Sequence, residues 1–192
     1  MFDRADFRGN ARFTEGRFSG DVVFGWARFR ESAWFKEAHF DGKTAFDEAK
    51  FSGRAVFGGA WFGEDAMFGK SQLGEDAWFG AATFNGRAGF REAQVSRDAV
   101  FVAARFGWDA TFEEVQFRRD ADFSEAKFNR DAWFHKAQFS GTLEFDRARF
   151  DKDAYIADAT VSHPTDEDIW PDGWEVAHSP IPDTAQLVRQ KL

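Results

Sequence analysis

The chain has 192 residues and a formal net charge of −8, so it is long enough for one ordinary domain and its charge disfavours nucleic acid as a direct ligand. It contains no cysteine, which excludes disulfides and cysteine-ligated metals. The N-terminus MFDRADFRGN is charged from its third residue on, and no stretch approaches the roughly 18 apolar residues of a membrane span, so we expect a cytoplasmic protein with no secretory signal and no membrane association.

Phenylalanine follows a strict register that begins at Phe2. Large apolar residues occupy 30 positions between Phe2 and Val161, and the gaps between them alternate between five and six residues. Twenty-six of these residues are Phe, which accounts for every Phe in the chain. The repeat is therefore an 11-residue unit with two large apolar positions, as from Phe2 to Phe13, and such a repeat decides the fold.

A small residue stands two positions before each large one, as in Ala5-Asp6-Phe7. This alternation places the first and third residues on one side of a short strand and the middle residue on the other. A helix is excluded because steps of five and six would spread the Phe over two helix faces and the Ala over two more, which leaves no polar side. In chain order we predict short strands at 5–7, 11–13, 16–18, 22–24 and onward through 159–161.

The residues between the strands form corners of two and three residues in alternation. Corners of equal length must lie over one another when coils stack, so the number of faces in each coil is even. Two faces of three-residue strands would enclose almost no interior, so we predict four faces and a 22-residue coil made of two repeat units. Thirty strands then make about seven and a half coils, at ~4.8 Å between stacked strands.

The A-x-F words at near-fivefold spacing resemble the pentapeptide-repeat proteins, over residues 1–161. The resemblance implies a right-handed quadrilateral β-helix with the small and central residues inside. The chain departs from the usual pattern of that family, since every second unit has a sixth residue and Phe replaces Leu, and it looks like a Phe-rich branch. The predicted fold class is thus all-β, with a β-helix at 1–161 and a capping loop and short helix at 162–192.

Stacked Phe side chains are predicted to fill the interior of the coil. Each buried Phe contributes roughly 1.5–3 kcal/mol, so such a ladder can form the core of a chain with few Leu. The ladder residues singled out are Phe35, Phe40, Phe46, Phe51, Phe57, Phe62, Phe84 and Phe101.

A 22-residue coil sorts the outward residues into four columns. One column is an apolar stripe, the Trp stripe, and such a patch is either a protein interface or a row of neighbours that simply stabilises a sheet. A second column predicts a ladder of hydrogen-bonded amides. The Trp stripe comprises Trp34, Val56, Trp78 and Val100, and the amide ladder comprises Gln72, Gln94, Gln116 and Gln138.

The register ends after Val161, and both ends of the coil need cover because open ends expose strand edges and Phe rings. We expect a short helix that begins at Asp183 or Thr184 and ends near Lys191. At the other end Phe2 is already in register, so the first coil is frayed, continues a longer chain or meets a second copy in a homodimer. The predicted C-terminal cap residues are Ile169, Trp170, Trp174 and Val176.

Catalysis needs side chains that converge in a concave site, which a filled solenoid does not offer. His39 and His135 lie outward on different faces, His163 and His178 lie in the tail, and no spacing resembles a zinc site. We therefore predict no enzyme activity, no metal and no cofactor.

Two functions remain open from the sequence. The first is a non-catalytic scaffold that binds a protein whose identity the sequence does not give. The second is implied by the resemblance, because some pentapeptide-repeat proteins imitate duplex DNA, bind DNA gyrase and protect it from inhibitors. Residues 1–161 hold 27 acids and 23 bases, and one face carries Arg17, Arg105, Lys127 and Arg149, which weighs against a DNA mimic.

Overall fold

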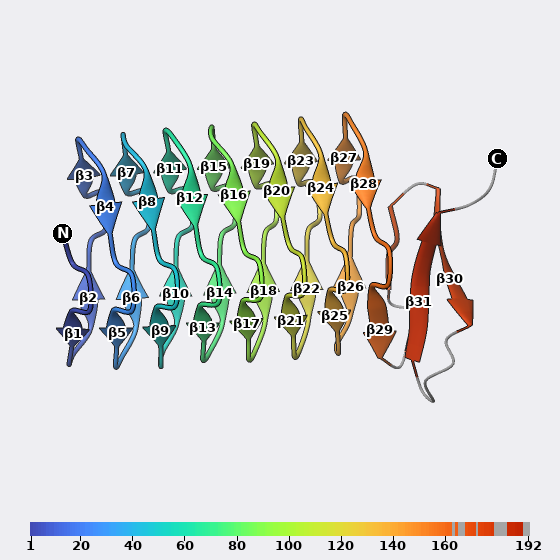
Figure 1. Ribbon diagram of the computed structural model, residues 1–192, viewed down its shortest axis with the longest axis horizontal. Helices are drawn as coiled ribbons and strands as arrows, with labels where there is room; N and C mark the ends of the chain where they lie inside the picture. Colours follow the sequence, from blue (N-terminus) through green and yellow to red (C-terminus); the bar gives the residue numbers. More distant parts are fainter. Residues whose placement is uncertain (163, 165–167, 172, 179–183, 190–192) are drawn as a thin grey trace.

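The computed structural model describes residues 1–162, 164, 168–171, 173–178 and 184–189. The chain winds into a rod of stacked coils, and an antiparallel pair of strands, β30 (Trp174–His178) and β31 (Thr184–Arg189), lies at its C-terminal end (Figure 1). All elements in the described residues are strands, which confirms the predicted all-β class. None of these residues forms a helix of the length and hydropathy needed to cross a membrane.

The strands form four sheets, one on each face of the coil, and the sheets are named after their outward side chains. The Gln sheet contains, in spatial order, β1 (Asp6–Phe7), β5 (Arg28–Phe29), β9 (Lys50–Phe51), β13 (Gln72–Leu73), β17 (Gln94–Val95), β21 (Gln116–Phe117), β25 (Gln138–Phe139), β29 (Thr160–Ser162), β31 and β30. The Trp sheet contains β2 (Ala11–Arg12), β6 (Ala33–Trp34), β10 (Ala55–Val56), β14 (Ala77–Trp78), β18 (Ala99–Val100), β22 (Ala121–Asp122) and β26 (Leu143–Glu144).

The other two sheets have the same construction. The basic sheet contains β3 (Arg17–Phe18), β7 (His39–Phe40), β11 (Trp61–Phe62), β15 (Thr83–Phe84), β19 (Arg105–Phe106), β23 (Lys127–Phe128) and β27 (Arg149–Phe150). The mixed sheet contains β4 (Val22–Val23), β8 (Thr44–Ala45), β12 (Ala66–Met67), β16 (Ala88–Gly89), β20 (Ala110–Thr111), β24 (Ala132–Trp133) and β28 (Ala154–Tyr155).

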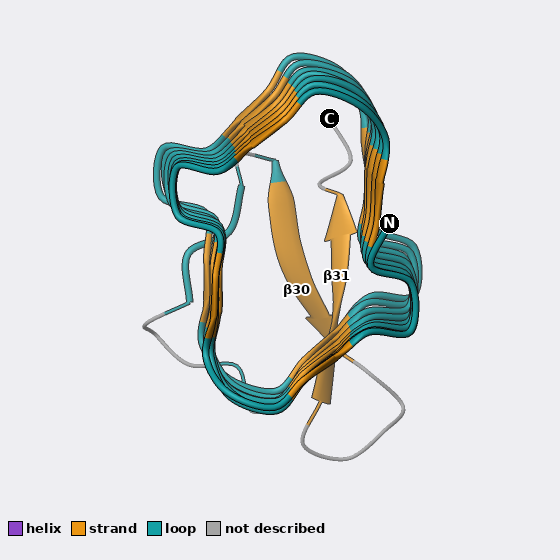
Figure 2. Cartoon of the chain, turned by 90° about the vertical axis from the view of Figure 1, so that its left-hand side faces the viewer, coloured by secondary structure: helices purple, strands orange, loops and turns teal. Residues whose placement is uncertain are grey.

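Neighbouring strands of successive coils are parallel, and each residue lies beside its counterpart in the next coil. Asp6 lies beside Arg28, and Val56 lies between Trp34 and Trp78. Backbone N–H groups donate to the neighbouring coil, as from Arg28 N to the Ala5 carbonyl oxygen at 2.8 Å. Seen along the axis, the coils superimpose closely, corners included (Figure 2). The predicted four-sided, 22-residue coil is confirmed.

Each two-residue corner turns through a residue with positive φ. These residues recur at the period of the repeat unit, and Gly59 is the one glycine among them from Arg4 to Asp158. The corner is closed by an i→i+3 hydrogen bond, such as Ala38 N to the Phe35 carbonyl oxygen at 3.0 Å. Positive φ at the third residue together with this bond is typical of a type II turn.

Aspartate at the third position of a three-residue corner links one coil to the next. Asp65 Oδ1 accepts the backbone N–H of Arg87 at 2.9 Å, and Asp120 Oδ1 accepts that of Thr142 at 2.9 Å. In both cases donor and acceptor are 22 residues apart. The side chain thus supplies a partner within the protein for a corner N–H group of the next coil.

Phenylalanine rings stack along each column inside the coil. Phe57 lies parallel to Phe35 and Phe79, with ring centroids 4.8 and 4.9 Å apart, and it meets Phe46 edge to face at 5.2 Å. Both arrangements are favourable for aromatic pairs. The predicted Phe ladder is confirmed, and its eight residues are buried, each at most 2% exposed: Phe35, Phe40, Phe46, Phe51, Phe57, Phe62, Phe84 and Phe101.

The predicted C-terminal helix is wrong. Thr184–Arg189 is strand β31, which pairs antiparallel with β29 on one side and β30 on the other. The open edge of β29 carries backbone groups that a strand can pair and a helix cannot, and this pairing outweighs the local signal for a helix start. Asp183 and Lys191, the expected helix limits, lie outside the described residues.

The tail covers the last coil in two ways. Ile169 extends the Trp sheet by a parallel bridge to Glu144, and Asp168 Oδ1 accepts the Leu143 N–H at 2.7 Å. Trp174 is buried against the terminal rings, 5.7 Å from Phe145 between centroids. Trp170 is partly buried against the same core. Val176 lies in β30, and its side chain is outside the described part of the structure.

The first coil is less covered than the interior coils. Phe2, Phe7, Phe13 and Phe18 are only half-buried, whereas Phe24 is fully buried. The interior of the rod is therefore closed by Trp174 at one end and ends in half-buried rings at the other.

Candidate functional site

The Trp stripe lies on consecutive strands of the Trp sheet. Trp34, Val56, Trp78 and Val100 point outward because the preceding Ala of each strand takes the inward position and is buried. Trp78 is 50% exposed, Trp34 and Val100 are half-buried, and Val56 is almost covered. The structure thus brings together all four residues that the sequence singled out.

A groove of about 300 Å³ lies within the stripe. The two indoles stand two coils apart, or ~10 Å at the spacing of parallel strands, and Val56 lies between them. A valine between two tryptophans leaves a hollow that an apolar side chain of another molecule can fill. The lining residues are Trp34, Lys36, Arg54, Val56, Gly58 and Trp78.

Charged side chains surround this groove and pair with one another. Arg54 Nε lies 3.3 Å from Asp76 Oδ2, and Arg97 Nε lies 3.6 Å from the other oxygen of the same carboxylate. Lys36 Nζ pairs with Glu37 at 3.3 Å. An apolar centre with a charged rim is the usual anatomy of a protein–protein interface.

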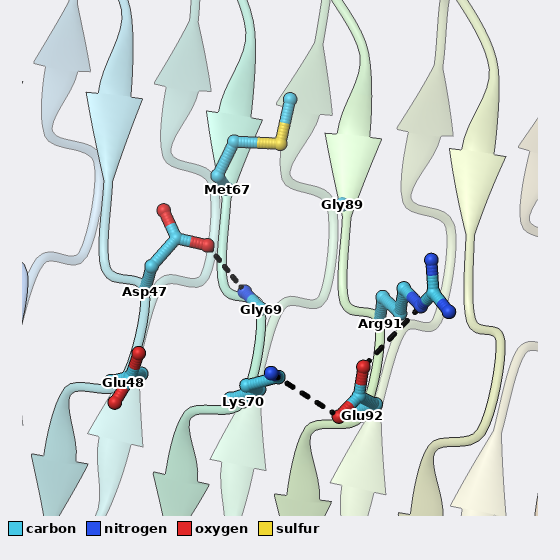
Figure 3. Close-up of a pocket in the computed structure, with 8 residues that line it drawn as sticks. All are labelled: Asp47, Glu48, Met67, Gly69, Lys70, Gly89, Arg91 and Glu92. Carbon is cyan, nitrogen blue, oxygen red and sulfur yellow. Dashed lines mark hydrogen bonds and ion pairs between the residues drawn. The ribbon is translucent and has the colours of Figure 1, made fainter.

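A second hollow, of about 240 Å³, lies on the mixed sheet and its corner (Figure 3). It opens where Gly89 follows Met67, and a Cβ at Gly89 would lie 2.6 Å from the Met67 sulfur. Asp47 Oδ1 accepts the Gly69 N–H at 3.0 Å, and burial raises the pKa of the Asp47 carboxyl. Because Asp47, the most buried acid of this hollow, accepts a backbone hydrogen bond, its role is structural.

The rim of the second hollow is also paired. Lys70 Nζ lies 3.6 Å from Glu92 Oε2, and Arg91 Nε lies 3.4 Å from Glu92 Oε1 (Figure 3). Both cations that line the hollow are thus engaged by Glu92.

Within the described residues, no three His, Cys, Asp or Glu side chains come together as a metal site would require. His39 Nδ1 lies 3.1 Å from the Glu37 carbonyl oxygen, and its ring lies 6.0 Å from that of Trp61. His135 sits on a corner of the mixed sheet. His163 and the side chain of His178 are outside the described part of the chain.

The amide ladder is placed as predicted, but its hydrogen bonding differs. Gln72, Gln94 and Gln116 lie in register on adjacent strands. Among the described residues, the side-chain hydrogen bond of this column runs from Arg118 Nη2 to Gln94 Oε1, at 3.4 Å, rather than between amides. A long cation on the neighbouring corner competes with the adjacent amide for the same oxygen.

Two exposed tryptophans lie on corners, outside every site expected from the repeat pattern. Trp26 is 48% exposed, donates from Nε1 to Glu48 Oε2 at 2.8 Å and lies under Arg4. Trp108 is 52% exposed and lies 5.4 Å from the Arg130 guanidinium carbon. In the sequence, both tryptophans stand in corners, outside the triplets of a small residue, any residue and a large apolar residue, such as Ala5-Asp6-Phe7.

A family model described as pentapeptide repeats (9 copies) matches the chain four times, at residues 2–44, 35–83, 79–127 and 112–160. These overlapping matches extend from the first coil through nearly the whole solenoid. A search of curated proteins and a search of solved structures each found no match.

Proposed function

Because the chain belongs to the pentapeptide-repeat family, whose solenoids are generally non-catalytic scaffolds, we propose that it is a rigid scaffold that binds a partner protein through the Trp stripe. The observation that carries the proposal is the groove of about 300 Å³ lined by Trp34, Val56 and Trp78. Tryptophan is enriched among residues that dominate binding energy. The sheet beneath the groove is fixed by coil-to-coil hydrogen bonds, so little ordering entropy is lost on binding.

The competing interpretation is that the stripe only stabilises its sheet. Cross-strand neighbours contribute roughly 0.2–1 kcal/mol per pair, and an indole gains from burial only to the extent that it is covered. Trp78 leaves half of its surface in water, so a purely structural role uses little of that side chain. A partner that covers it would use the rest.

The experiment is a pull-down of the full chain against a lysate of the source cell. The variant Trp34→Ser/Trp78→Ser is expected to capture at least tenfold less of the partner than the wild-type chain, because both walls of the groove are removed. Trp108→Ser is the matched control, since Trp108 is as exposed as Trp78 but lies on a corner between the basic and mixed sheets. Equal capture by the double variant and the wild-type chain would refute the proposal.

DNA gyrase as the target is the second proposal, and the charge pattern weighs against it. A mimic of duplex DNA needs a dominant acidic face, whereas Arg105, Lys127 and Arg149 lie in line on the basic sheet. We expect no inhibition of supercoiling and no protection from quinolones by micromolar protein in a gyrase assay. Clear protection would place gyrase ahead of other partners.

Self-association through an end of the solenoid stays a prediction. Light scattering of the wild-type chain and of Trp34→Ser/Trp78→Ser separates an end-to-end dimer, which the substitutions leave intact, from a dimer through the Trp stripe, which they dissociate.

A further inference from the structure

Three cations stand in line on the C-terminal half of the basic sheet. Arg105 lies beside Lys127, and Lys127 lies beside Arg149, on adjacent parallel strands. All three side chains are exposed. Parallel strands hold neighbours ~4.8 Å apart, and like charges placed directly side by side on a sheet are unfavourable. We name these three residues the basic column.

The nearest acids do not neutralise the basic column. Arg147 on the adjoining corner pairs with Glu125 at 3.7 Å and with Asp146 at 3.5 Å. No ion pair within 4 Å joins Arg105, Lys127 or Arg149 to another described residue. A hollow of about 270 Å³ lies over the column, lined by Ala103, Arg105, Glu125, Lys127, Arg147 and Arg149. Once Arg147 and Glu125 offset each other, three positive charges remain.

A second run of adjacent cations in the same protein is largely offset by acids, which makes the contrast informative. Arg28 and Lys50 are neighbours on the Gln sheet. The hollow beside them also holds Lys70, but it contains the carboxylates of Glu48 and Glu92 as well. The hollow over the basic column holds one acid, Glu125, which is paired with Arg147, so the charge of the column is available to a ligand.

We propose that the basic column is a binding site for a diphosphate group. Two arginines can each offer a planar fork of N–H donors to phosphoryl oxygens, and the lysine between them adds a compact charge. Side chains one strand spacing apart can converge on a single phosphoryl group, and the third cation reaches the second one. The total of three unpaired cations suits an anion that carries several charges within a short length.

The same chemistry has two sources, inorganic pyrophosphate and the diphosphate of a nucleoside diphosphate. Both would remove the repulsion within the column and stabilise the folded chain by mass action. Because the side chains are exposed, binding weakens as salt screens the charges. No change of backbone conformation is required, since the strands are already in register.

The test is calorimetric titration of the full chain with pyrophosphate and with ADP at low ionic strength, and inorganic phosphate as the single-group comparison. We expect pyrophosphate to bind more tightly than phosphate, and Lys127→Gln to weaken it at least tenfold. Binding of ADP as tightly as pyrophosphate identifies a nucleotide site, whereas binding of pyrophosphate alone identifies a site for the free anion. Arg28→Gln/Lys50→Gln is the matched control and should change the affinity less than twofold.

A second measurement separates a ligand site from a structural role. Without ligand, Lys127→Gln is expected to raise Tm, because it removes the middle charge of the column. Absence of pyrophosphate binding by the wild-type chain, or equal binding by the wild-type chain and Lys127→Gln, would overturn the proposal. The site lies on a different sheet from the Trp stripe, so its failure leaves the proposed scaffold function untouched.

Discussion

Single residues at the two-residue corners adopt a strained backbone conformation. Fourteen residues other than Gly adopt positive φ there, Glu37 and Ala81 among them. The left-handed conformation costs a non-glycine residue roughly 1–2 kcal/mol. The corner hydrogen bond and the register of the neighbouring coils hold each residue in place against that cost. Gly59 is the position where the sequence avoids it.

Ala81→Gly is expected to stabilise the protein by up to about 1 kcal/mol, because relief of the left-handed strain exceeds the added entropy of the unfolded chain. Urea unfolding measures the change. The control is Ala82→Gly, one residue further on, whose side chain is fully buried and whose removal should destabilise the protein. A loss of stability in both variants would show that the corner conformation is not strained.

Asp47 gives the protein a predicted pH dependence. Burial raises the pKa of its carboxyl from the ordinary 3.8, so the folded state holds the proton to higher pH than the unfolded state does. Stability is therefore lost as pH rises from the ordinary pKa of an aspartate toward the raised pKa of Asp47 in the folded state. Asp47→Asn keeps an oxygen for the Gly69 N–H and has no charge to bury, so it should be more stable than wild type at pH 7 and nearly equal at pH 3.

Denaturant unfolding at both pH values tests this expectation. Asp41→Asn is the control, since Asp41 is exposed. A variant that is less stable than wild type at pH 7 would mean that the charged form is favoured by its surroundings.

At the scale of the strand and its neighbours, the ladder of rings holds the coils together. Each strand has only two residues in most cases, so no strand has local stability, and the stacked side chains provide it. Phe101 stacks on Phe79 and Phe123, each 4.9 Å away, and meets Phe90 edge to face at 5.4 Å. Rings of Phe106 and Phe112 also contact it, so loss of Phe101 leaves a cavity lined by five other rings.

Phe101→Ala is expected to cost about 3–5 kcal/mol of unfolding free energy. Phe2→Ala, in the half-buried first coil, should cost clearly less, because water already reaches that ring. Chemical denaturation of both variants provides the comparison. A cost below about 1 kcal/mol for Phe101→Ala would contradict the ladder as the main source of stability.

The same scale shows what the sequence could and could not predict. The five-six spacing determines which residue lies beside which, so the columns and the Trp stripe follow from counting. The hairpin β30–β31 does not, because Thr184–Arg189 is short, and the free edge of β29 decides its structure. Ile169 joins the Trp sheet beside Glu144 but lies outside the 22-residue register of the coils, so no periodicity could have indicated it.

The groove and the basic column can likewise be predicted only in part from the sequence. The columns that contain them can be read from the sequence, yet their chemical meaning depends on the corners. Asp76 neutralises Arg54 beside the groove, whereas the acid nearest the basic column, Glu125, is already paired with Arg147. Which corner side chain reaches which column depends on the conformation of long side chains, and spacing alone does not specify that.

At the scale of the whole molecule, the inward residues of the repeat determine the shape of the rod, and the outward residues determine what it can bind. The interior is nearly uniform along the rod, whereas the outward residues differ from coil to coil. A change in the number of 11-residue units should therefore alter which columns align and leave the coil itself intact. This separation allows the recognition surface to be moved without any point mutation.

The most direct test compares two deletions in the partner pull-down. Deletion of 47–57 removes one repeat unit, or half a coil, keeps the alternation of corners and moves Trp78 to the sheet opposite Trp34. Deletion of 113–134 removes two repeat units, or one full coil, and leaves the Trp stripe unchanged. Circular dichroism should show that both variants fold. We expect the full-coil deletion to retain the partner and the half-coil deletion to lose it. Capture of the partner by the half-coil deletion would contradict the Trp stripe as the recognition surface.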